Sequence, residues 1–170
     1  ATLDLISDGR VELGIGEGAS TTELHPFNVK FRDKRLVWED AVRCTLPMFY
    51  NHAWEYDGAF YKFPKRAVIP KPMQKPHPPL WVACSQLDTI RYSAHRGMGA
   101  LCFKFVDLES SKAWVNAYYN TFLHNQEKLC DYQSNPNLAV VGGFMCAKTD
   151  EEAWQKADGW TFFQFALQLF

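Results

Sequence analysis

Residues 8–18 read DGRVELGIGEG, a stretch that combines a short apolar alternation with four glycines. The alternation, at Val11, Leu13 and Ile15, is typical of a half-buried β-strand. Glycine at the end of such a strand has two interpretations. It either marks a close approach by a ligand or another backbone, or it forms a turn that needs a positive φ. The stretch alone favours neither, so the choice depends on what the rest of the chain builds around it.

The residues that follow the glycines argue against two phosphate-binding motifs. A P-loop ends on Lys-Ser or Lys-Thr, whereas Gly18 is followed by Ala19 and Ser20. A dinucleotide-binding fingerprint needs Gly-x-Gly-x-x-Gly at the start of a helix, whereas the spacing here is Gly-x-Gly-x-Gly. Pro26 also disfavours a helix that runs through the residue before it. A strand over residues 11–15 remains the prediction.

The composition is that of one globular domain. The chain has 170 residues, of which 47% are hydrophobic and 22% charged, and its formal net charge is -1. We therefore expect a single domain over residues 1–170. Nucleic acid is not expected as a partner, because no basic run is interleaved with aromatic residues. A membrane is not expected either, because no apolar stretch reaches the length of a span and the first residues do not resemble a signal peptide.

The cysteines and histidines predict neither disulfides nor a metal site. The chain has five of each, with no Cys-x-x-Cys and no His-x-x-x-His spacing. Unpaired cysteines of this kind favour reduced thiols and a cytoplasmic location. The last residues, 160–170, read WTFFQFALQLF, an apolar run without a polar tail, so we expect a piece of a longer chain.

Short apolar runs alternate with amphipathic segments along the chain. The apolar runs predict buried strands over residues 80–84, 100–103 and 138–144 in addition to 11–15. The segments between them predict helices over residues 34–49, which Pro47 should kink or end, 85–96, 108–128 and from Thr149, where a capping box begins. This alternation predicts an α/β fold of about four parallel β/α units.

The carboxyl ends of parallel strands share one edge, so the residues that follow each strand should meet at one rim. Those residues are Gly16–Gly18, Cys84–Gln86, Lys104–Phe105 and Cys146–Ala147. Two other segments interrupt the alternation. Residues 17–32 are expected to form a loop or lid, and residues 50–79 a hairpin with an Asp57–Gly58 turn followed by a proline-rich insertion.

Several of these pieces, in this order, resemble the flavin-dependent luciferase-like monooxygenases, the family of bacterial luciferase and alkanal monooxygenase. The pieces are LDLISDGRVELGIGEG (3–18), Glu23 and Phe27, VWEDAVR (37–43), YDGAFYKF (56–63), PKPMQKPHPPLWVACS (70–85) and AHRGMGAL (94–101). The resemblance is strong over residues 3–103 and looser beyond. It departs from the family at Asn28, where glycine is usual, and at Gly16, where the light-emitting α chain has a reactive cysteine.

The resemblance implies a TIM-type (β/α)8 barrel, of which this chain would supply strands 4–7. It implies reduced FMN as cofactor, with the deazaflavin F420 as the alternative, and O2-dependent oxidation of an apolar organic substrate such as an aldehyde, alkane or terpene. A separate flavin reductase and a homo-oligomer are further implied partners. Two alternative functions remain: an F420-dependent oxidoreductase of the same fold, and a non-catalytic flavin-binding half-barrel that needs assembly.

The resemblance also assigns cofactor-binding residues at two strand ends. They are Gly16, Glu17 and Gly18 after the first strand, and Cys84, Ser85, Gln86 and Thr89 after the second. The flavin phosphate is expected on the second group, because a hydroxyl and free amides at a helix N-terminus suit a dianion. Ser85 as a plain helix N-cap is the alternative.

The catalytic residues are unknown, because the family's catalytic histidine lies on strands that this chain lacks. Glu23 is interpreted as a structural residue that holds its loop, and His25 as a surface residue. An incomplete barrel should leave one sheet face without cover, with Val82 and Leu101 among its side chains. We therefore expect the isolated chain to self-associate or stay partly molten, to retain no flavin and to be inactive.

Overall fold

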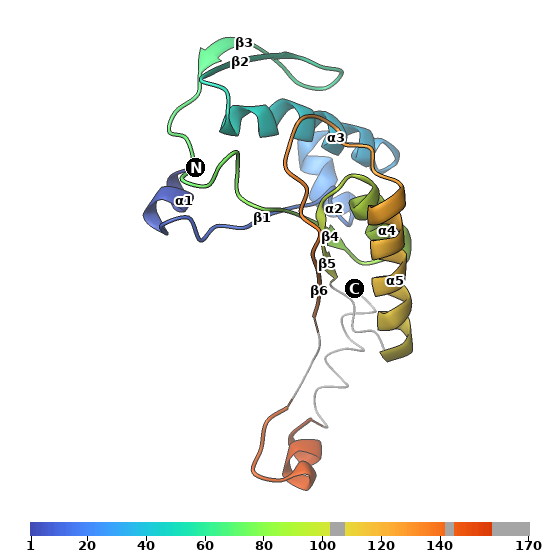
Figure 1. Cartoon of the computed structure of the whole chain (residues 1–170). Coiled ribbons are helices and arrows are strands. Elements are labelled where there is room, and N and C mark those ends of the chain that lie inside the picture. Colours follow the sequence, from blue (N-terminus) through green and yellow to red (C-terminus); the bar gives the residue numbers. More distant parts are fainter. Residues whose placement is uncertain (103–107, 142–144, 158–170) are drawn as a thin grey trace.

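The computed structural model describes residues 1–102, 108–141 and 145–157. Its centre is a sheet of four strands, β1 (Leu13–Ile15), β4 (Leu80–Cys84), β5 (Gly99–Cys102) and β6 (Leu138–Val140). The strands lie in the order β1-β4-β5-β6 and every neighbouring pair is parallel (Figure 1). The predicted α/β fold with a parallel sheet is confirmed, and β4 matches its predicted range. Residues 103 and 142–144 of the predicted strands lie outside the described residues.

Three helices join one core on one side of this sheet. They are α3 (Lys34–Thr45), α4 (Leu87–His95) and α5 (Leu108–His124). In Figure 1 the sheet is seen nearly edge-on, and α4 and α5 lie on the same side of it. Trp38 from α3, Ile90 from α4 and Tyr118 from α5 pack into the cluster that also contains the buried strand residues. The core therefore sits between the sheet and its helices.

The other face of the sheet is uncovered within the described residues. Along β4, Leu80, Val82 and Cys84 are 0%, 4% and 1% exposed, whereas Ala83 between them is exposed. Leu101 on β5 lies on the same face as Ala83 and is half-buried. The expectation for Val82 was wrong: it faces the helices, because alternate side chains of a strand point to opposite faces.

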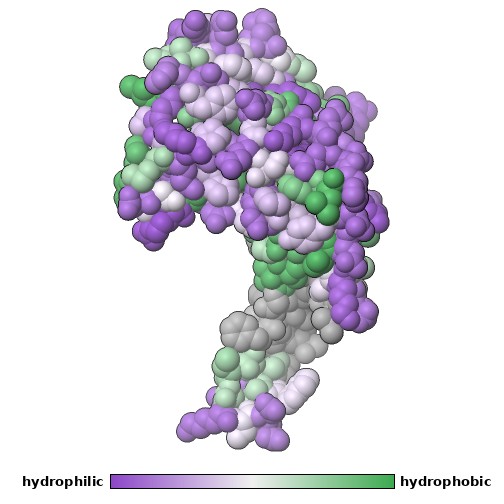
Figure 2. Space-filling model, in the orientation of Figure 1, coloured by the Kyte–Doolittle hydropathy of each residue, from purple (hydrophilic) through white to green (hydrophobic). Residues whose placement is uncertain are grey.

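The sheet also ends in two open edges. Within the described residues β1 pairs only with β4, and β6 only with β5. Beside β6, Val140 and Val141 are 39% and 46% exposed. Figure 2 shows hydrophobic residues gathered around the lower strands, while the surface over α3 and the hairpin is mostly hydrophilic.

Several element boundaries differ from the sequence prediction. The helix predicted over residues 34–49 ends at Thr45 and continues as a 3-10 helix, Leu46–Phe49, because Pro47 cannot donate the next α-helical hydrogen bond. The helix predicted over residues 85–96 begins only at Leu87. The helix predicted over residues 108–128 ends at His124, because the amide of Glu127 instead donates to the His95 carbonyl at 2.7 Å.

The two ends of the described chain are short helices. The first is α1 (Thr2–Ile6), whose Asp4 is fully buried and accepts hydrogen bonds from the backbone and side-chain amides of Gln74, both at 2.8 Å. The last covers residues 150–157. The Thr149 hydroxyl accepts from the Glu152 amide at 3.2 Å, as the predicted capping box requires.

Residues 17–32, expected as a loop or lid, contain short helices instead. These are α2 (Thr21–Leu24) and two 3-10 helices, His25–Phe27 and Phe31–Asp33. A capping box starts α2: Ser20 accepts the amide of Glu23, and Glu23 accepts the amides of Ser20 and Ala19. Glu23 therefore holds this segment, as the sequence indicated.

The segment after α3 forms an antiparallel hairpin of β2 (Ala53–Asp57) and β3 (Lys62–Ala67). Its turn is fixed to α3 by Asp40, which is buried. The Asp40 carboxylate accepts from the Tyr56 hydroxyl at 2.6 Å and from the amides of Phe60 and Tyr61 at 2.8 and 3.1 Å. Extended, proline-rich chain then leads from the hairpin to β4.

Candidate functional site

The predicted residues after β1 and β4 lie side by side at the carboxyl end of the sheet. The pairing of Ile15 with Val82 brings Gly16 next to Ala83. A Cβ built on Gly16 would lie 3.6 Å from the Cβ of Ala83, which is ordinary van der Waals contact. The structure thus brings together two of the groups that the sequence placed at one rim.

The glycines of the opening stretch divide between the two interpretations. Gly18 has a φ of +83°, and an added Cβ would lie 2.8 Å from Leu24, so it serves a turn. Gly16 has no positive φ and is exposed on the uncovered face of the sheet. No turn requires glycine at position 16, which leaves close approach of another group as its interpretation.

The side chains on the uncovered face become smaller from the amino ends of the strands to their carboxyl ends. At the amino end the Trp81 ring covers Gly99, whose added Cβ would lie 2.6 Å from that ring. Leu101 fills the middle, next to Gly14. At the carboxyl ends of β1 and β4, the small residues Gly16 and Ala83 face outward, and both are exposed. A flat molecule would therefore find the most room at the rim.

The start of α4 leaves polar groups free at this rim. Its N-cap is Gln86, in an extended conformation and without a side-chain capping bond. Ser85 is therefore not the N-cap, which corrects that alternative. The Ser85 side chain is exposed and has no hydrogen-bond partner among the described residues. The amide of Thr89 donates to the Gln86 carbonyl at 3.1 Å, whereas those of Leu87 and Asp88 have no partner among the described residues and are available to an acceptor.

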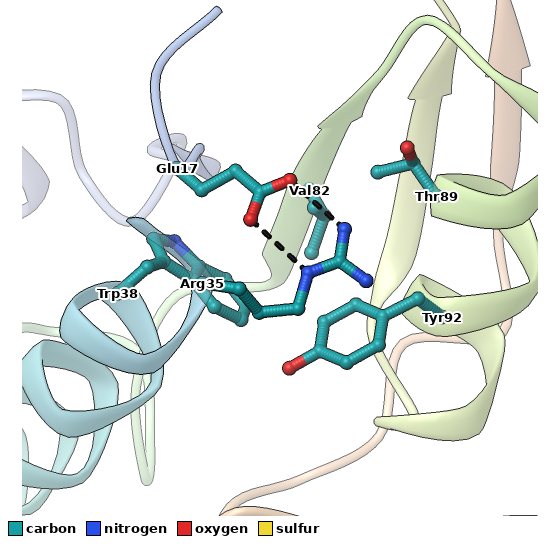
Figure 3. Close-up of a pocket in the computed structure, with 6 residues that line it drawn as sticks. All are labelled: Glu17, Arg35, Trp38, Val82, Thr89 and Tyr92. Atoms are coloured by element: carbon teal, nitrogen blue, oxygen red, sulfur yellow. Dashed lines mark hydrogen bonds and ion pairs between the residues drawn. The ribbon is translucent and has the colours of Figure 1, made fainter. Parts of the chain in front are cut away.

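A small hollow lies between α3 and α4 beside the rim (Figure 3). It encloses about 190 Å3, including space open to solvent. The residues that line it are Glu17, Arg35, Trp38, Val82, Thr89 and Tyr92. Two of the predicted site residues, Glu17 and Thr89, thus meet here. Arg35, Trp38 and Tyr92 are additions that the sequence did not indicate.

Arg35 is the central side chain of the hollow. Its Nε and Nη2 donate to the two carboxylate oxygens of Glu17 at 3.1 and 2.9 Å. Its guanidinium carbon lies 4.3 Å from the centre of the Tyr92 ring. The remaining nitrogen, Nη1, has no hydrogen-bond partner among the described residues, and in Figure 3 it points into the gap between Thr89 and Tyr92.

Glu17 and Arg35 stabilise each other in their charged forms. Burial alone would raise the pKa of Glu17, but the hydrogen bonds and charges of Arg35 and Lys34 outweigh it and hold that pKa below its usual value. The bond to Glu17 raises the pKa of Arg35. Lys34 lies 3.7 Å from Glu17 and donates to the Gly18 carbonyl at 2.9 Å. One anion and two cations leave an excess positive charge next to the helix start.

The remaining predicted residues do not line the hollow. The Cys84 side chain points into the core, and burial raises its thiol pKa to about 12, so only its backbone faces the rim. His25 is exposed on its 3-10 helix and Cys146 is exposed. Lys104 and Phe105 lie outside the described residues.

The described residues contain neither a candidate metal site nor a candidate membrane span. No group of three or more histidine, cysteine or acidic side chains there could hold a metal ion. None of the helices in residues 1–102, 108–141 and 145–157 combines the length and apolar character of a membrane span.

The sequence itself decides the family. Residues 1–169 match the family model described as luciferase-like monooxygenase. The chain belongs to this family. The predicted resemblance is thereby confirmed, and it extends beyond residue 103, where the motifs alone were loose.

Two curated luciferase-like proteins illustrate the relationship. The oxygenase component of the flavin-dependent trigonelline monooxygenase of Acinetobacter baylyi is 31% identical over 158 residues, which are 90% of this chain and 42% of that protein. The alkanal monooxygenase beta chain of Photorhabdus luminescens is 27% identical over 105 residues, which are 62% of this chain and 32% of that protein. This chain therefore spans less than half of either relative.

Two solved structures share the fold. The monooxygenase RslO1 of Streptomyces bottropensis superposes with a TM-score of 0.71 and 21% identity, over 92% of this chain and 47% of its own. The oxygenating constituent of 3,6-diketocamphane monooxygenase of Pseudomonas putida, in complex with FMN, superposes with a TM-score of 0.64 and 16% identity, over 98% of this chain and 50% of its own. The chain thus covers about half of each of these two structures.

Proposed function

We propose that this chain forms strands 4–7 of a (β/α)8 barrel that acts as a flavin-dependent monooxygenase, with FMN as the cofactor. The phosphate of FMN would lie at the start of α4, held by Ser85, Thr89, the free amides and Arg35. The observation that carries this proposal is the Nη1 of Arg35, which has no partner among the described residues and lies beside Tyr92, next to a helix start without a side-chain cap. Fixed donors of this kind suit a dianion.

The charge of the site fits the phosphate end of a flavin, but the hollow is too small to enclose that end. It has room for about one water molecule, far less than the roughly 300–1,000 Å3 of sites that enclose a whole cofactor. The phosphate would therefore lie at the mouth of the hollow, and the flat ring system on the bare surface at Gly16 and Ala83. Asp88, in the first turn of α4, is exposed and faces Arg91 at 3.5 Å, so it leaves the phosphate position free.

Reduced FMN, when bound, supplies the electrons with which O2 oxidises an apolar organic substrate such as an aldehyde, alkane or terpene. The residues of this chain would bind the phosphate, orient the ring and exclude water from one side of it. The relative from Acinetobacter is described as an oxygenase component, which supports a separate flavin reductase as partner. The bare rim would equally accept F420, and the site residues alone do not distinguish the two cofactors.

Further features of the whole protein belong to the same proposal. They are a cytoplasmic location, a homo-oligomeric assembly, the lid function of residues 17–32 and a catalytic residue on strands that this chain lacks. A non-catalytic flavin-binding half-barrel is the second candidate function, and it is favoured by the two open sheet edges.

The test is a comparison of FMN with riboflavin, which lacks the phosphate. We expect FMN to bind more tightly than riboflavin in flavin-fluorescence titrations of a longer protein that carries this chain. Arg35→Met should reduce FMN affinity about tenfold and leave riboflavin affinity unchanged. Arg66→Met removes the same charge from the exposed hairpin strand β3 and should change neither. Equal binding of both flavins, before and after Arg35→Met, would refute the phosphate site.

A further inference from the structure

We propose that Glu17 is an internal counter-ion that competes with the incoming phosphate for Arg35, and thereby keeps cofactor binding weak and exchangeable. This inference rests on the proposed function, because it concerns the same site. It assigns Glu17 a role opposite to the one expected from sequence: Glu17 would weaken cofactor binding rather than contribute to it.

The geometry shows that Glu17 already occupies the preferred face of Arg35. Both carboxylate oxygens accept hydrogen bonds from the guanidinium, in the paired arrangement by which arginine also binds phosphate. The Glu17 side chain is only 18% exposed, so water screens the pair weakly. A phosphate at Thr89 therefore meets an arginine that retains one free nitrogen and whose charge is largely neutralised.

Arg35 does not depend on Glu17 for its position. The guanidinium stacks on the Tyr92 ring, and Tyr92 itself is held by an edge-on contact with Trp38, with ring centres 5.9 Å apart. The Tyr92 hydroxyl also donates to Glu39, which Arg96 binds at 2.9 Å. Removal of the Glu17 charge should therefore leave Arg35 in place with its donors free, rather than let it swing out of the hollow.

Competition of this kind has a functional consequence. A phosphate dianion carries more charge than one carboxylate, so it can still displace or share the Glu17 contact, but part of its binding energy is spent in doing so. The result is faster release of the flavin. Rapid release suits an oxygenase whose cofactor is reduced on a separate protein and must be exchanged in each cycle.

The test measures binding rather than turnover, with FMN, riboflavin and inorganic phosphate as probes. Glu17→Gln should tighten FMN and phosphate binding about tenfold, slow FMN release in stopped-flow measurements and leave riboflavin unchanged. Glu17→Asp retains the charge and should behave like the original chain. Glu55→Gln, which removes an exposed carboxylate from β2, is the matched control and should have no effect.

The outcomes separate the two proposals. If Arg35→Met weakens FMN binding and Glu17→Gln weakens it as well or leaves it unchanged, Glu17 only positions Arg35 and this inference is wrong. If Arg35→Met has no effect on FMN binding, the phosphate site itself is refuted. Circular dichroism of each variant identifies a folding defect. If Glu17→Gln has one, the decision rests on Glu17→Asp and on the rate of FMN release from the original chain at increasing salt. Competition predicts that this release is faster than in barrels without a carboxylate at this position.

Discussion

The two faces of the sheet differ in both packing and chemistry. On the helix side, the side chains of Leu80, Val82 and Cys84 are almost fully buried, and the Cys84 thiol donates weakly to the Val82 carbonyl. On the other side, the same strand presents Trp81 and Ala83 next to the bare Gly16. One face thus holds the domain together, while the other is uncovered within the described residues and is the face on which we propose that the flavin ring lies. Substitutions on the helix side should therefore change mainly the stability of the fold, and substitutions at the rim of the other face mainly ligand binding.

The largest expected effect concerns the uncovered face as a whole. Leaving a few hundred Å2 of apolar surface in water forfeits several kcal/mol at about 25 cal/mol per Å2, which rivals the total stability of a domain. We expect the isolated chain of 19.6 kDa to elute from size exclusion as a larger species, or to bind a hydrophobic dye as a partly molten monomer. Light scattering on the eluting peak measures this. A compact monomer that binds no dye would show that the face needs no cover.

Two leucines on neighbouring strands test the comparison directly. Leu80→Ala on the covered face should lower the free energy of unfolding by about 3 kcal/mol, because Leu80 is fully buried in the core. Leu101→Ala, on the uncovered face, should lower it by only about 1 kcal/mol, because Leu101 is half-buried. Urea denaturation followed by tryptophan fluorescence measures both. Equal losses would mean that another copy of the chain already covers Leu101.

Asp40 extends the comparison to a buried charge on the helix side. Burial alone would raise its pKa, but the hydrogen bonds from Tyr56, Phe60 and Tyr61 hold it below the usual value. Because the folded pKa lies below that of the unfolded chain, its stabilising contribution is complete above about pH 4 and is lost as the pH falls through the folded pKa. Asp40→Asn should cost about 2 kcal/mol at pH 7 and flatten the loss of stability below pH 4. An unchanged acid transition would exclude Asp40 as its cause.

The smallest expected effect on the stability of the fold lies at the rim. Ser85→Ala should leave the stability of the fold unchanged, because its hydroxyl has no partner among the described residues and does not cap α4. It should weaken FMN binding by about 1–2 kcal/mol through one lost charge-assisted hydrogen bond. Ser111→Ala on α5 serves as the control in the same titration. A drop in melting temperature without a change in FMN affinity would reverse the assignment of Ser85.

The parts of the fold that the sequence predicted well are those with a local cause. The run 80–84 became β4 without a boundary error because alternate residues are fully buried, and Pro47 ended α3 because it lacks an amide hydrogen. The end of α5 was missed because its cause is a contact with the distant His95 carbonyl. Helix pattern alone contains no information on such a contact.

The site shows the same division. Gly16, Ser85 and Thr89 could be predicted because they follow strands, and parallel strands bring their carboxyl ends to one edge. Arg35 could not, because on its own helix it has the pattern of an ordinary surface charge. Only its bidentate bond to Glu17, across 18 positions of sequence, identifies it as part of the site. The bare face at Gly16 likewise became distinguishable from a turn only once its φ was known.

The parallel direction of β1 and β6 at the two open edges has a consequence for how such barrels can be recombined. Edge hydrogen bonds are made by backbone atoms, so they demand a partner of matching direction and register rather than of particular sequence. A different first half, with its own substrate pocket, could be joined to this second half without rebuilding the phosphate end of the cofactor site. The edges thus mark natural crossover points for chimeric enzymes, in which one half would retain the cofactor while the other changes the reaction's substrate.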